Sequence, residues 1–219
     1  MAEAGLPKRI VAAARRMNTL GINQGASGNV SARAGRGFLI TPSAMTYEAM
    51  GAGDIVKISV AGKAQGVRMP SSEWRIHHDI YAARLDAGAI VHTHSVQATA
   101  LACLGRPIPA FHYMVAVAGG DSIRCAPYAV FGSQALSDAA LKALADRRAC
   151  LLANHGVIAL GADLDAALGL AVEVETLAAL YLAALGAGAP KNLSKKQMAE
   201  VLVRFERYRA GQSVEGDEP

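Results

Sequence analysis

Apolar residues recur every three to four positions in several stretches of the chain, and this spacing predicts helices with one buried face. In the first stretch, Ile10, Val11, Ala14 and Met17 share a face, and Gly21 follows as a helix-ending residue. In the last stretch, Ser194 followed by a glutamine three positions on is a capping box. We therefore expect helices over residues 8–20, 72–84, 95–104, 133–145, 163–185 and 194–209.

Between these stretches lie short apolar or alternating runs bounded by glycine, proline, serine or asparagine, which is typical of β-strands. We expect strands over residues 30–33, 38–40, 55–60, 89–93, 114–117 and 126–130, and two short strands within 150–160. Strands and helices mix without a regular strand–helix–strand repeat. The pattern predicts one α/β domain over residues 1–210, with a mixed central β-sheet sandwiched between helices, and a disordered polar tail over 211–219.

Composition excludes some functional classes. The hydrophobic share of 52% supports a sizeable core, and the net charge of +4 comes from scattered basic pairs with only 5% aromatic residues, which argues against nucleic-acid binding. Three well-separated cysteines indicate buried free thiols in a reducing compartment. The most lipid-like run, 177–185, is shorter than the ~18 residues of a spanning helix. We expect a cytoplasmic protein with no membrane partner.

The sharpest local feature is the pair His92 and His94 in a predicted strand. Residues two apart in a strand point to the same face, so the two imidazoles lie side by side. By itself the pair is explained equally well by a metal site and by two histidines on a solvent-exposed face of a sheet. His155, between Asn154 and Gly156 at a predicted turn, is likewise ambiguous alone. Together the three histidines predict an open catalytic metal site, with three nitrogen ligands and a free position for substrate.

A second feature suits an anion. Ser71 and Ser72 stand at a predicted helix start, where main-chain N–H groups are free to bind phosphate. Glu73 follows in the expected first turn, where plain helix capping is the alternative role. The turns at Gly28-Asn29 and Thr41-Pro42-Ser43 could present further N–H groups and a hydroxyl to the same anion.

Two other histidines and a tyrosine are less specific. His77 and His78 have no partner at metal-ligand spacing, so we interpret them as packing or surface residues. Tyr113, in a stretch that reads as a loop, carries a phenol that could donate a proton to an alkoxide.

Six motifs in order resemble the class II aldolase/adducin family, and most closely its L-fuculose-1-phosphate aldolase branch. The resemblance runs from the first helix to Tyr208. The motifs are QGASGNVS at 24–31, ITP at 40–42, PSSEW at 70–74, VHTH at 91–94, IPAFHYM at 108–114 and NHG at 154–156.

This resemblance implies one Zn²⁺ per chain, or Mn, Co or Fe in its place, held by His92, His94 and His155. It implies Glu73 as the catalytic acid and base beside the metal. It also implies a pocket for the substrate phosphate, formed by Gly28, Asn29, Ser43, Ala44, Ser71 and Ser72.

The resemblance further implies a homotetramer with active sites at subunit interfaces. Tyr113 would reach into the site of the neighbouring chain, and Tyr208 would close over the aldehyde end. One departure stands in the second phosphate loop, where Ser43-Ala44 replaces a threonine-glycine pair. Alanine resists positive φ, so this loop is expected to shift slightly.

The implied activity is reversible cleavage of a ketose 1-phosphate of the L-fuculose 1-phosphate type to dihydroxyacetone phosphate and an aldehyde. Glu73 would need a raised pKa to exchange the C3 proton. Three alternatives stay open: the same chemistry on 5-deoxyribulose or 5-(methylthio)ribulose 1-phosphate, a pentulose-5-phosphate 4-epimerase, and a non-catalytic scaffold like adducin. The epimerases carry aspartate where Glu73 stands, and a scaffold would be expected to lack the metal ligands.

Overall fold

The computed structural model describes residues 5–209, whose strands form one eight-stranded sheet in the order β4-β3-β2-β1-β5-β8-β7-β6. Six neighbouring pairs are antiparallel and β6–β7 is parallel, so the sheet is mixed as expected. The strands are β1 (Asn29–Ala34), β2 (Gly37–Ile40), β3 (Val56–Ile58), β4 (Ala64–Gln65), β5 (Ala89–Thr93), β6 (Arg124–Ala126), β7 (Ala149–Leu152) and β8 (Gly156–Gly161).

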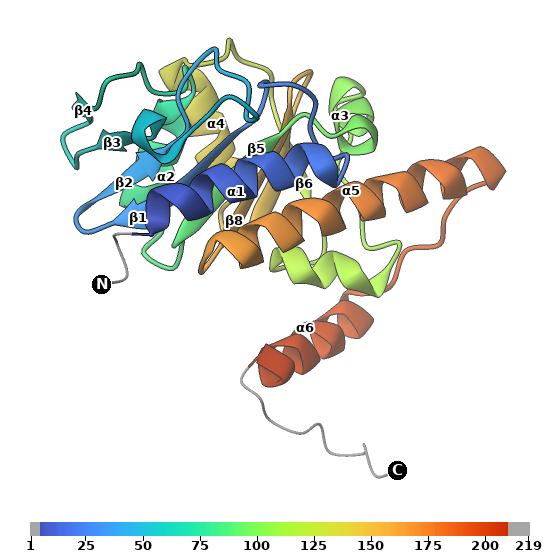
Figure 1. Cartoon of the computed structure of the whole chain (residues 1–219). Coiled ribbons are helices and arrows are strands. Elements are labelled where there is room, and N and C mark those ends of the chain that lie inside the picture. Colours follow the sequence, from blue (N-terminus) through green and yellow to red (C-terminus); the bar gives the residue numbers. More distant parts are fainter. Residues whose placement is uncertain (1–4, 210–219) are drawn as a thin grey trace, which may run out of the picture.

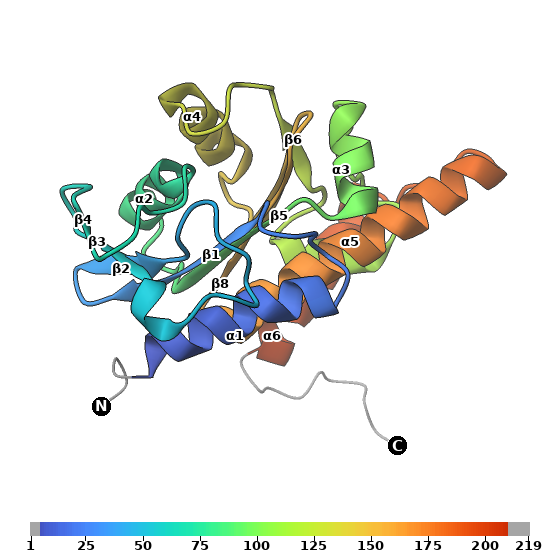
Figure 2. The same cartoon turned by 45° about the horizontal axis from the view of Figure 1, so that its top comes forward.

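Helices cover both faces of this sheet (Figures 1 and 2). α2 and α4 lie on one face, and α1 and α5 lie side by side across the other. The helices are α1 (Leu6–Thr19), α2 (Trp74–Ala83), α3 (Val96–Cys103), α4 (Gln134–Ala143), α5 (Leu164–Ala187) and α6 (Lys195–Arg209), with 3₁₀ helices η1 (Ala52–Asp54) and η2 (Tyr113–Ala118).

Alternation along the strands divides the buried residues into two cores, one on each face. In β5, Ala89 and Val91 join the core under α1 and α5, whereas Ile90 joins the core under α2 and α4. Leu151 and Leu152 of β7 divide in the same way. The predicted layered α/β domain is therefore confirmed, and each strand residue has a defined face.

Two predicted strands are wrong. Residues 114–117 form the 3₁₀ helix η2, in which Val115 and Ala116 pack into the core and the His112 ring accepts a hydrogen bond from the Met114 N–H. A short apolar run does not by itself distinguish strand from helix. Residues 126–130 leave the sheet at once, because β6 ends at Ala126 and Pro127 has no N–H to donate to a ladder.

Other differences are smaller. β3 covers only Val56–Ile58 of the strand expected over 55–60. α2 begins at Trp74, so Glu73 stands at the N-cap position and not in the first turn, and its side chain makes no capping hydrogen bond. The cysteines are free, but only Cys150 is buried, whereas Cys103 is exposed. The expected tail over 211–219 lies outside the described residues.

The expectation about lipid-like segments needs correction. α5 has 24 residues and contains an 18-residue window of mean hydropathy 1.7, which is long and apolar enough to cross a membrane by length and composition alone. Its buried residues, from Leu164 to Ala178, pack in the core beneath β8 and β5. Within the apolar window, 33% is buried inside the protein.

Candidate metal centre

Three segments bring three histidines and one glutamate to the same point on the α2/α4 face. His92 lies in β5 and His94 directly after it, so both share the face of Ile90. His155 lies in the turn between β7 and β8, and β8 pairs with β5 so that Ile158 faces His92. Glu73 stands at the N-cap position of α2. The predicted cluster is therefore assembled by neighbouring strands and one helix start.

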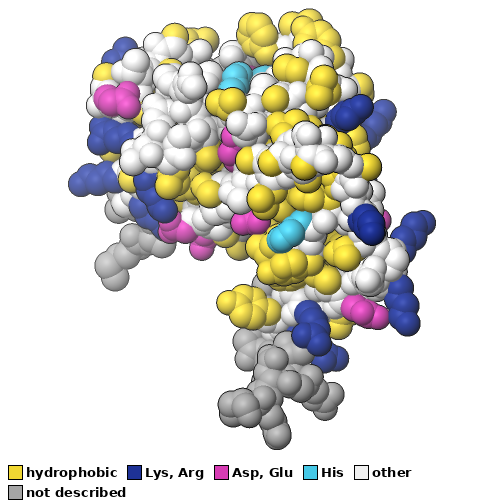
Figure 3. Space-filling model, turned by 90° about the vertical axis from the view of Figure 1, so that its right-hand side faces the viewer, with side chains coloured by type: hydrophobic (Ala, Val, Ile, Leu, Met, Phe, Trp, Pro, Cys, Tyr) yellow, Lys and Arg dark blue, Asp and Glu magenta, His cyan; other side chains and the backbone are white. Residues whose placement is uncertain are grey.

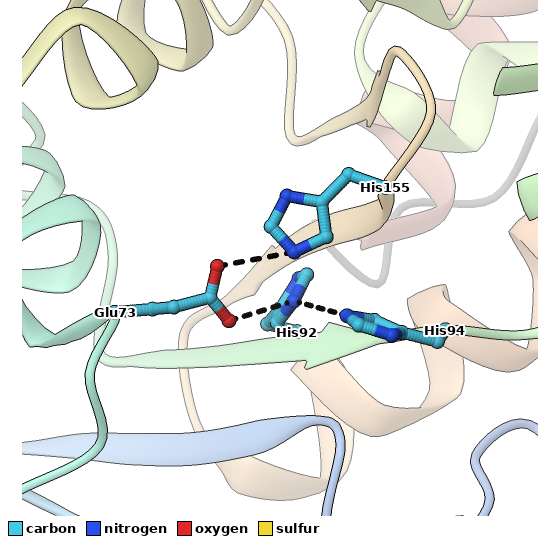
Figure 4. Close-up of side chains that lie close together, drawn as sticks. All are labelled: Glu73, His92, His94 and His155. Atoms are coloured by element: carbon cyan, nitrogen blue, oxygen red, sulfur yellow. Dashed lines mark hydrogen bonds and ion pairs between the residues drawn. The ribbon is translucent and has the colours of Figure 1, made fainter. Parts of the chain in front are cut away.

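The three imidazoles surround a common centre (Figure 4). Their ring centroids are 4.9, 4.9 and 5.0 Å apart, and each pair of rings is inclined by 76° to 82°. The Nε2 atoms of His92 and His94 are 3.0 Å apart. Glu73 Oε2 lies 3.0 Å from His92 Nε2, and Oε1 lies 3.1 Å from His155 Nε2. Four ligand atoms thus fall within 4.8 Å of one another.

Main-chain contacts fix the orientation of the His92 ring. Its Nδ1 donates to the carbonyl oxygen of Val157, 2.9 Å away in β8, which leaves the Nε2 lone pair directed at the centre. Burial, together with His92 and His155, lowers the pKa of His94 to about 4. His94 is therefore neutral at physiological pH, as a metal ligand must be.

Backbone geometry holds the strands close at this point. A Cβ on Gly28 would lie 2.4 Å from the His92 carbonyl oxygen, and one on Gly156 would lie 2.3 Å from the Thr93 carbonyl oxygen. Asn154 adopts φ 55°, a left-handed conformation that asparagine tolerates well. The Asn-His-Gly sequence therefore suits the turn that carries His155.

Glu73 is 4% exposed, and its two oxygens differ. Oε2 accepts a hydrogen bond from Asn29 Nδ2 at 3.0 Å, whereas buried Oε1 makes an ion-pair contact with His155 Nε2 at 3.1 Å. Burial raises the pKa of Glu73, but the charge of His92 and the hydrogen bonds from His155 and His92 outweigh it and hold the pKa below its usual value. The raised pKa expected from the sequence is therefore not found while the imidazoles carry charge.

These residues fit a metal ion. Zinc takes imidazole nitrogens and carboxylate oxygens, and an open catalytic site commonly has three protein ligands. Here three Nε2 atoms converge from mutually inclined rings, and the two oxygens of a buried carboxylate lie 3.0 and 3.1 Å from two of these nitrogens. No other group of three or more His, Cys, Asp or Glu within residues 5–209 offers such an arrangement.

A cavity of about 290 Å³ opens beside the cluster. Part of its wall comes from the irregular segment after β6, which the sequence analysis assigned to a strand and thus did not connect with the site. Its lining residues are Ser27, Ser72, Glu73, His94, Tyr128, Ala129, Phe131, Asn154 and His155.

The turns expected to bind phosphate are braced against one another. Ser43 N donates to the Met69 carbonyl oxygen at 3.0 Å, and Ser71 N donates to the Thr41 carbonyl oxygen at 3.0 Å. Tyr47, which the sequence analysis did not single out, donates its hydroxyl to the Gly28 carbonyl oxygen at 2.5 Å. Ser72 lines the cavity beside the histidines, whereas Ser43 is not among its lining residues, and an anion-binding role for either hydroxyl stays a prediction.

Tyr113 and Tyr208 do not line the cavity at the histidines. They line a different cavity of about 590 Å³ between η2 and α6, together with Met114, Val201, Arg204 and Phe205. It shares no lining residue with the cavity at the histidines. Hydrophobic side chains are visible on the surface at this end of the molecule (Figure 3). Within one chain, therefore, the two tyrosines do not join the cluster of Glu73.

The layered mixed sheet gathers three histidines and a glutamate beside a cavity, which is a candidate single-metal centre of the kind found in enzymes. Residues 8–182 match the model of the Class II Aldolase and Adducin N-terminal domain, and the chain belongs to this family.

Relatives and solved structures agree. The chain is 54% identical over 199 residues to a 5-methylthioribulose-1-phosphate/5-deoxyribulose-1-phosphate aldolase from Rhodospirillum rubrum, covering 91% of this chain and 90% of the relative. It is 49% identical to an L-fuculose phosphate aldolase from Escherichia coli O6:H1, covering 93% and 95%. A solved L-fuculose 1-phosphate aldolase superposes with a TM-score of 0.91 at 37% identity, covering 94% and 98%. The protein is a class II aldolase, an aldehyde-lyase.

Proposed function

We propose that this chain holds one Zn²⁺ through His92, His94 and His155 and reversibly cleaves a ketose 1-phosphate to dihydroxyacetone phosphate and a short aldehyde. The convergence of three Nε2 atoms beside Glu73 carries this proposal. The names of the relatives, all phosphorylated-ketose aldolases, support the substrate class. A bound divalent cation would act as a Lewis acid on the ketose oxygens and stabilise the negative charge that cleavage leaves on the three-carbon fragment.

Glu73 carries the proton at C3. When the C3–C4 bond breaks, its electron pair stays with the three-carbon fragment, and Glu73 delivers a proton to C3 while the C4 hydroxyl loses its own. In the direction of synthesis, Glu73 removes the C3 proton. With the three imidazoles neutral as ligands, their charge no longer lowers the pKa of Glu73, but the charge of a bound divalent cation would take its place and oppose the effect of burial. Glu73 would then rest as a carboxylate, the form that removes the C3 proton in the direction of synthesis.

The phosphate is bound, in this proposal, by the turns of Gly28-Asn29, Ser43-Ala44 and Ser71-Ser72. Ser72 lines the cavity that also contains Glu73, so a phosphate there lies within one small molecule's length of the cluster. The side-chain amide of Asn29 is already bonded to Glu73.

The tail of the substrate distinguishes the two leading candidates. Tyr128, Ala129 and Phe131 give the open side of the cavity an apolar wall, which suits an aldehyde that ends in a methyl or methylthio group. The L-fuculose type is our first candidate. The second, 5-deoxyribulose or 5-(methylthio)ribulose 1-phosphate, is favoured by the 54% identical relative of that name. Glutamate at position 73 disfavours the epimerase.

We also propose that the enzyme is a cytoplasmic homotetramer whose sites lie between chains. The separate cavity around Tyr113 and Tyr208 supports this proposal. The two phenols do not line the histidine cavity of their own chain, so they would contact the histidine cluster of a neighbouring chain. In this arrangement Tyr113 exchanges the proton of the C4 hydroxyl, and Tyr208 covers the aldehyde.

One experiment tests the function without the aldehyde. The purified protein is incubated with dihydroxyacetone phosphate in D₂O, and loss of the C3 proton signal is followed by NMR. The wild-type chain should contain about one zinc by elemental analysis and exchange the proton. Glu73→Gln should retain most of the metal and lose exchange by at least ~100-fold, the size typical of general acid–base catalysis.

Glu48→Gln is the matched control, since Glu48 is exposed and does not line the cavity beside the histidines. Exchange by Glu73→Gln at the wild-type rate would refute the role of Glu73. His92→Ala that kept full metal and full exchange would refute the metal site.

A second experiment identifies the tail. The enzyme is given dihydroxyacetone phosphate with lactaldehyde, acetaldehyde or methylthioacetaldehyde, and kcat/KM is compared for carbon–carbon bond formation. A clear preference for lactaldehyde supports the fuculose type. Preference for either of the other two supports the salvage substrates, and no product with any aldehyde would contradict an aldolase of this substrate class.

A further inference from the structure

A line of buried polar side chains runs from Glu73 into the space between β1 and α2. Tyr81 OH lies 2.9 Å from Ser31 Oγ, and Ser31 Oγ lies 2.6 Å from His77 Nδ1. His77 Nε2 lies 2.5 Å from Asn29 Oδ1, and Asn29 Nδ2 lies 3.0 Å from Glu73 Oε2. All five residues are at most 5% exposed. Sequence analysis treated His77 as a packing residue, and nothing in the proposed chemistry uses it.

The donor and the acceptor of each hydrogen bond in this line follow from the chemistry of Glu73 at one end and of His77 in the middle. An ionised Glu73 only accepts, so Asn29 must turn its NH₂ toward Glu73 and its carbonyl oxygen toward His77. That oxygen can only accept, so the proton of His77 is on Nε2. Burial and the nearby His92 lower the pKa of His77 to about 3, so the ring is neutral and its Nδ1 must accept from Ser31. The Ser31 oxygen then accepts from Tyr81.

The far end of the line is held by packing. The Arg33 guanidinium lies 4.8 Å from the centre of the Tyr81 ring, and Arg33 Nη2 donates to the Tyr81 carbonyl oxygen. The Phe38 ring is 5.0 Å from that of Tyr81. Tyr81 is therefore fixed from two sides, and its hydroxyl has Ser31 as its hydrogen-bond partner.

The strands make this line continuous. Asn29 and Ser31 are two apart in β1, so they share the face toward α2, and Asn29 is directly opposite His92 in β5. His77 and Tyr81 are four apart in α2, one turn from each other on the helix face that covers β1. Glu73 directly precedes α2, so one continuous segment supplies the carboxylate and the groups that orient its partner.

We propose that Ser31 and His77 are positioning residues that hold the Asn29 amide with its NH₂ toward Glu73, and thereby aim the Glu73 carboxylate at the reacting carbon. Neither residue lines the substrate cavity. If Asn29 turned over, its carbonyl oxygen would face the carboxylate, two acceptors would meet, and Glu73 would be pushed from its place. This inference rests on the proposed role of Glu73 in proton exchange.

Variants at His77 separate positioning from packing. His77→Gln keeps a donor for Asn29 and an acceptor for Ser31, so it should restore the direction of the line. His77→Leu fills the space with apolar atoms but cannot donate to Asn29. We expect His77→Leu to lower the rate of C3 proton exchange on dihydroxyacetone phosphate on the order of 10-fold with KM little changed, and His77→Gln to recover most of that rate.

Tyr81→Phe is the matched control. It removes one buried hydrogen bond of the same line, but Ser31 can still donate to His77, so its exchange rate should stay within about 2-fold of wild type. Thermal stability of all three variants is measured alongside. If these residues had a purely structural role, the rate of C3 proton exchange would fall in proportion to the loss of thermal stability in every variant. That result would overturn the proposal.

A spectroscopic measurement needs no variant. In ¹⁵N-histidine-labelled wild-type protein, the His77 resonances should report a neutral ring with the proton on Nε2, and a proton on Nδ1 would contradict the proposal directly. Wild-type protein without proton exchange would instead refute the function of Glu73. Exchange in His77→Leu as fast as in wild type would refute only the positioning role.

Discussion

Ala44 stands in a backbone conformation that alanine adopts at a cost. Its φ is 53°, in the left-handed region, where the Cβ of an L-residue approaches the neighbouring carbonyl. The sequence analysis expected the loop to shift so that alanine could avoid positive φ. In the structure Ala44 itself has positive φ, so the backbone strain is confined to this one residue of the proposed phosphate site.

Ala44→Gly should therefore stabilise the protein. The left-handed conformation costs an alanine about 1–2 kcal/mol, and glycine loses about 0.5–1 kcal/mol more in chain entropy on folding. The net gain is about 0.5–1 kcal/mol, measured as a shift of the urea midpoint at unchanged m-value. Ala49→Gly, at an exposed position that is not among the residues with positive φ, is the control and should not stabilise. A destabilised Ala44→Gly would contradict the account of strain.

Single residues of the site could be predicted where their spacing alone constrains them. His92 and His94 share a face by strand alternation, and the glycine after His155 marks a turn. Phe131 and the partners of Asn29 could not be found this way, because they come from segments without periodicity or from contacts 44 and 48 positions apart. Such pairs depend on how the strands stack, which local sequence does not specify.

At the scale of elements, His78 and Asp79 connect α2 to its neighbours. His78 Nδ1 lies 2.9 Å from Asp79 Oδ1, and its Nε2 lies 2.9 Å from the Val60 carbonyl oxygen. Asp79 also accepts from Ser137 and Gln134 at the start of α4. Partial burial opposes the charged ring, but the bonds to Asp79 and Val60 outweigh it and raise the pKa of His78 above 6.5.

Stability should depend on pH through this pair. The raised pKa of His78 means that its contribution is complete below pH 6.5 and is lost as pH rises through the folded-state pKa. Partial burial raises the pKa of Asp79, but the bonds from Ser137 and His78 outweigh it and lower the pKa below 3.8, so its contribution is present above pH 3.8 and is lost on further acidification. The pair stabilises most between these two values.

Asp79→Asn should thus cost more at about pH 5.5 than at about pH 8.5, by about 0.5–1 kcal/mol, as judged by denaturant unfolding. Asp138→Asn is the control, because Asp138 shares Gln134 as a partner but has no histidine beside it. Equal losses for Asp79→Asn at both pH values would show that His78 carries no charge in the folded protein.

Elements themselves were predictable where periodicity and caps agreed, as for α1, α4 and α6. The α6 start is the capping box, in which Ser194 Oγ accepts from Gln197 N and the Gln197 side chain accepts from Ser194 N. The two misassigned runs, η2 and the segment after β6, are short and apolar, and their conformation follows from neighbours that are distant in sequence. η2 lines the cavity at Tyr113, and the segment after β6 lines the cavity beside the histidines. The two wrong assignments therefore concern segments to which we assign a role in the proposed function.

At the scale of the whole molecule, the proposed catalytic groups occupy two cavities that no single chain unites. If neighbouring chains join them, two inactive variants should repair each other. Co-expression of Glu73→Gln with Tyr113→Phe should give mixed tetramers in which about a quarter of the sites have both intact groups, for a cyclic assembly with random order. Aldol cleavage is then measured against each variant alone.

Co-expression of Glu73→Gln with Ser72→Ala is the control. Both residues line the same cavity of one chain, so no mixture can create an intact site from them. Absence of any gain in the Glu73→Gln and Tyr113→Phe mixture, with mixed assembly verified by tags, would place the tyrosine outside the active site.

The pairing of β5 between β1 and β8 limits how this chain can change in length. His92 and His94 face the site because they are an even number of positions from Ile90, whereas Ala89 and Val91 face α1 and α5. Inserting or deleting one residue ahead of His92 within β5 would turn both imidazoles to the opposite face, into the apolar core under α1 and α5. Substitutions in this strand can be graded in effect, but a one-residue insertion or deletion there removes the site altogether.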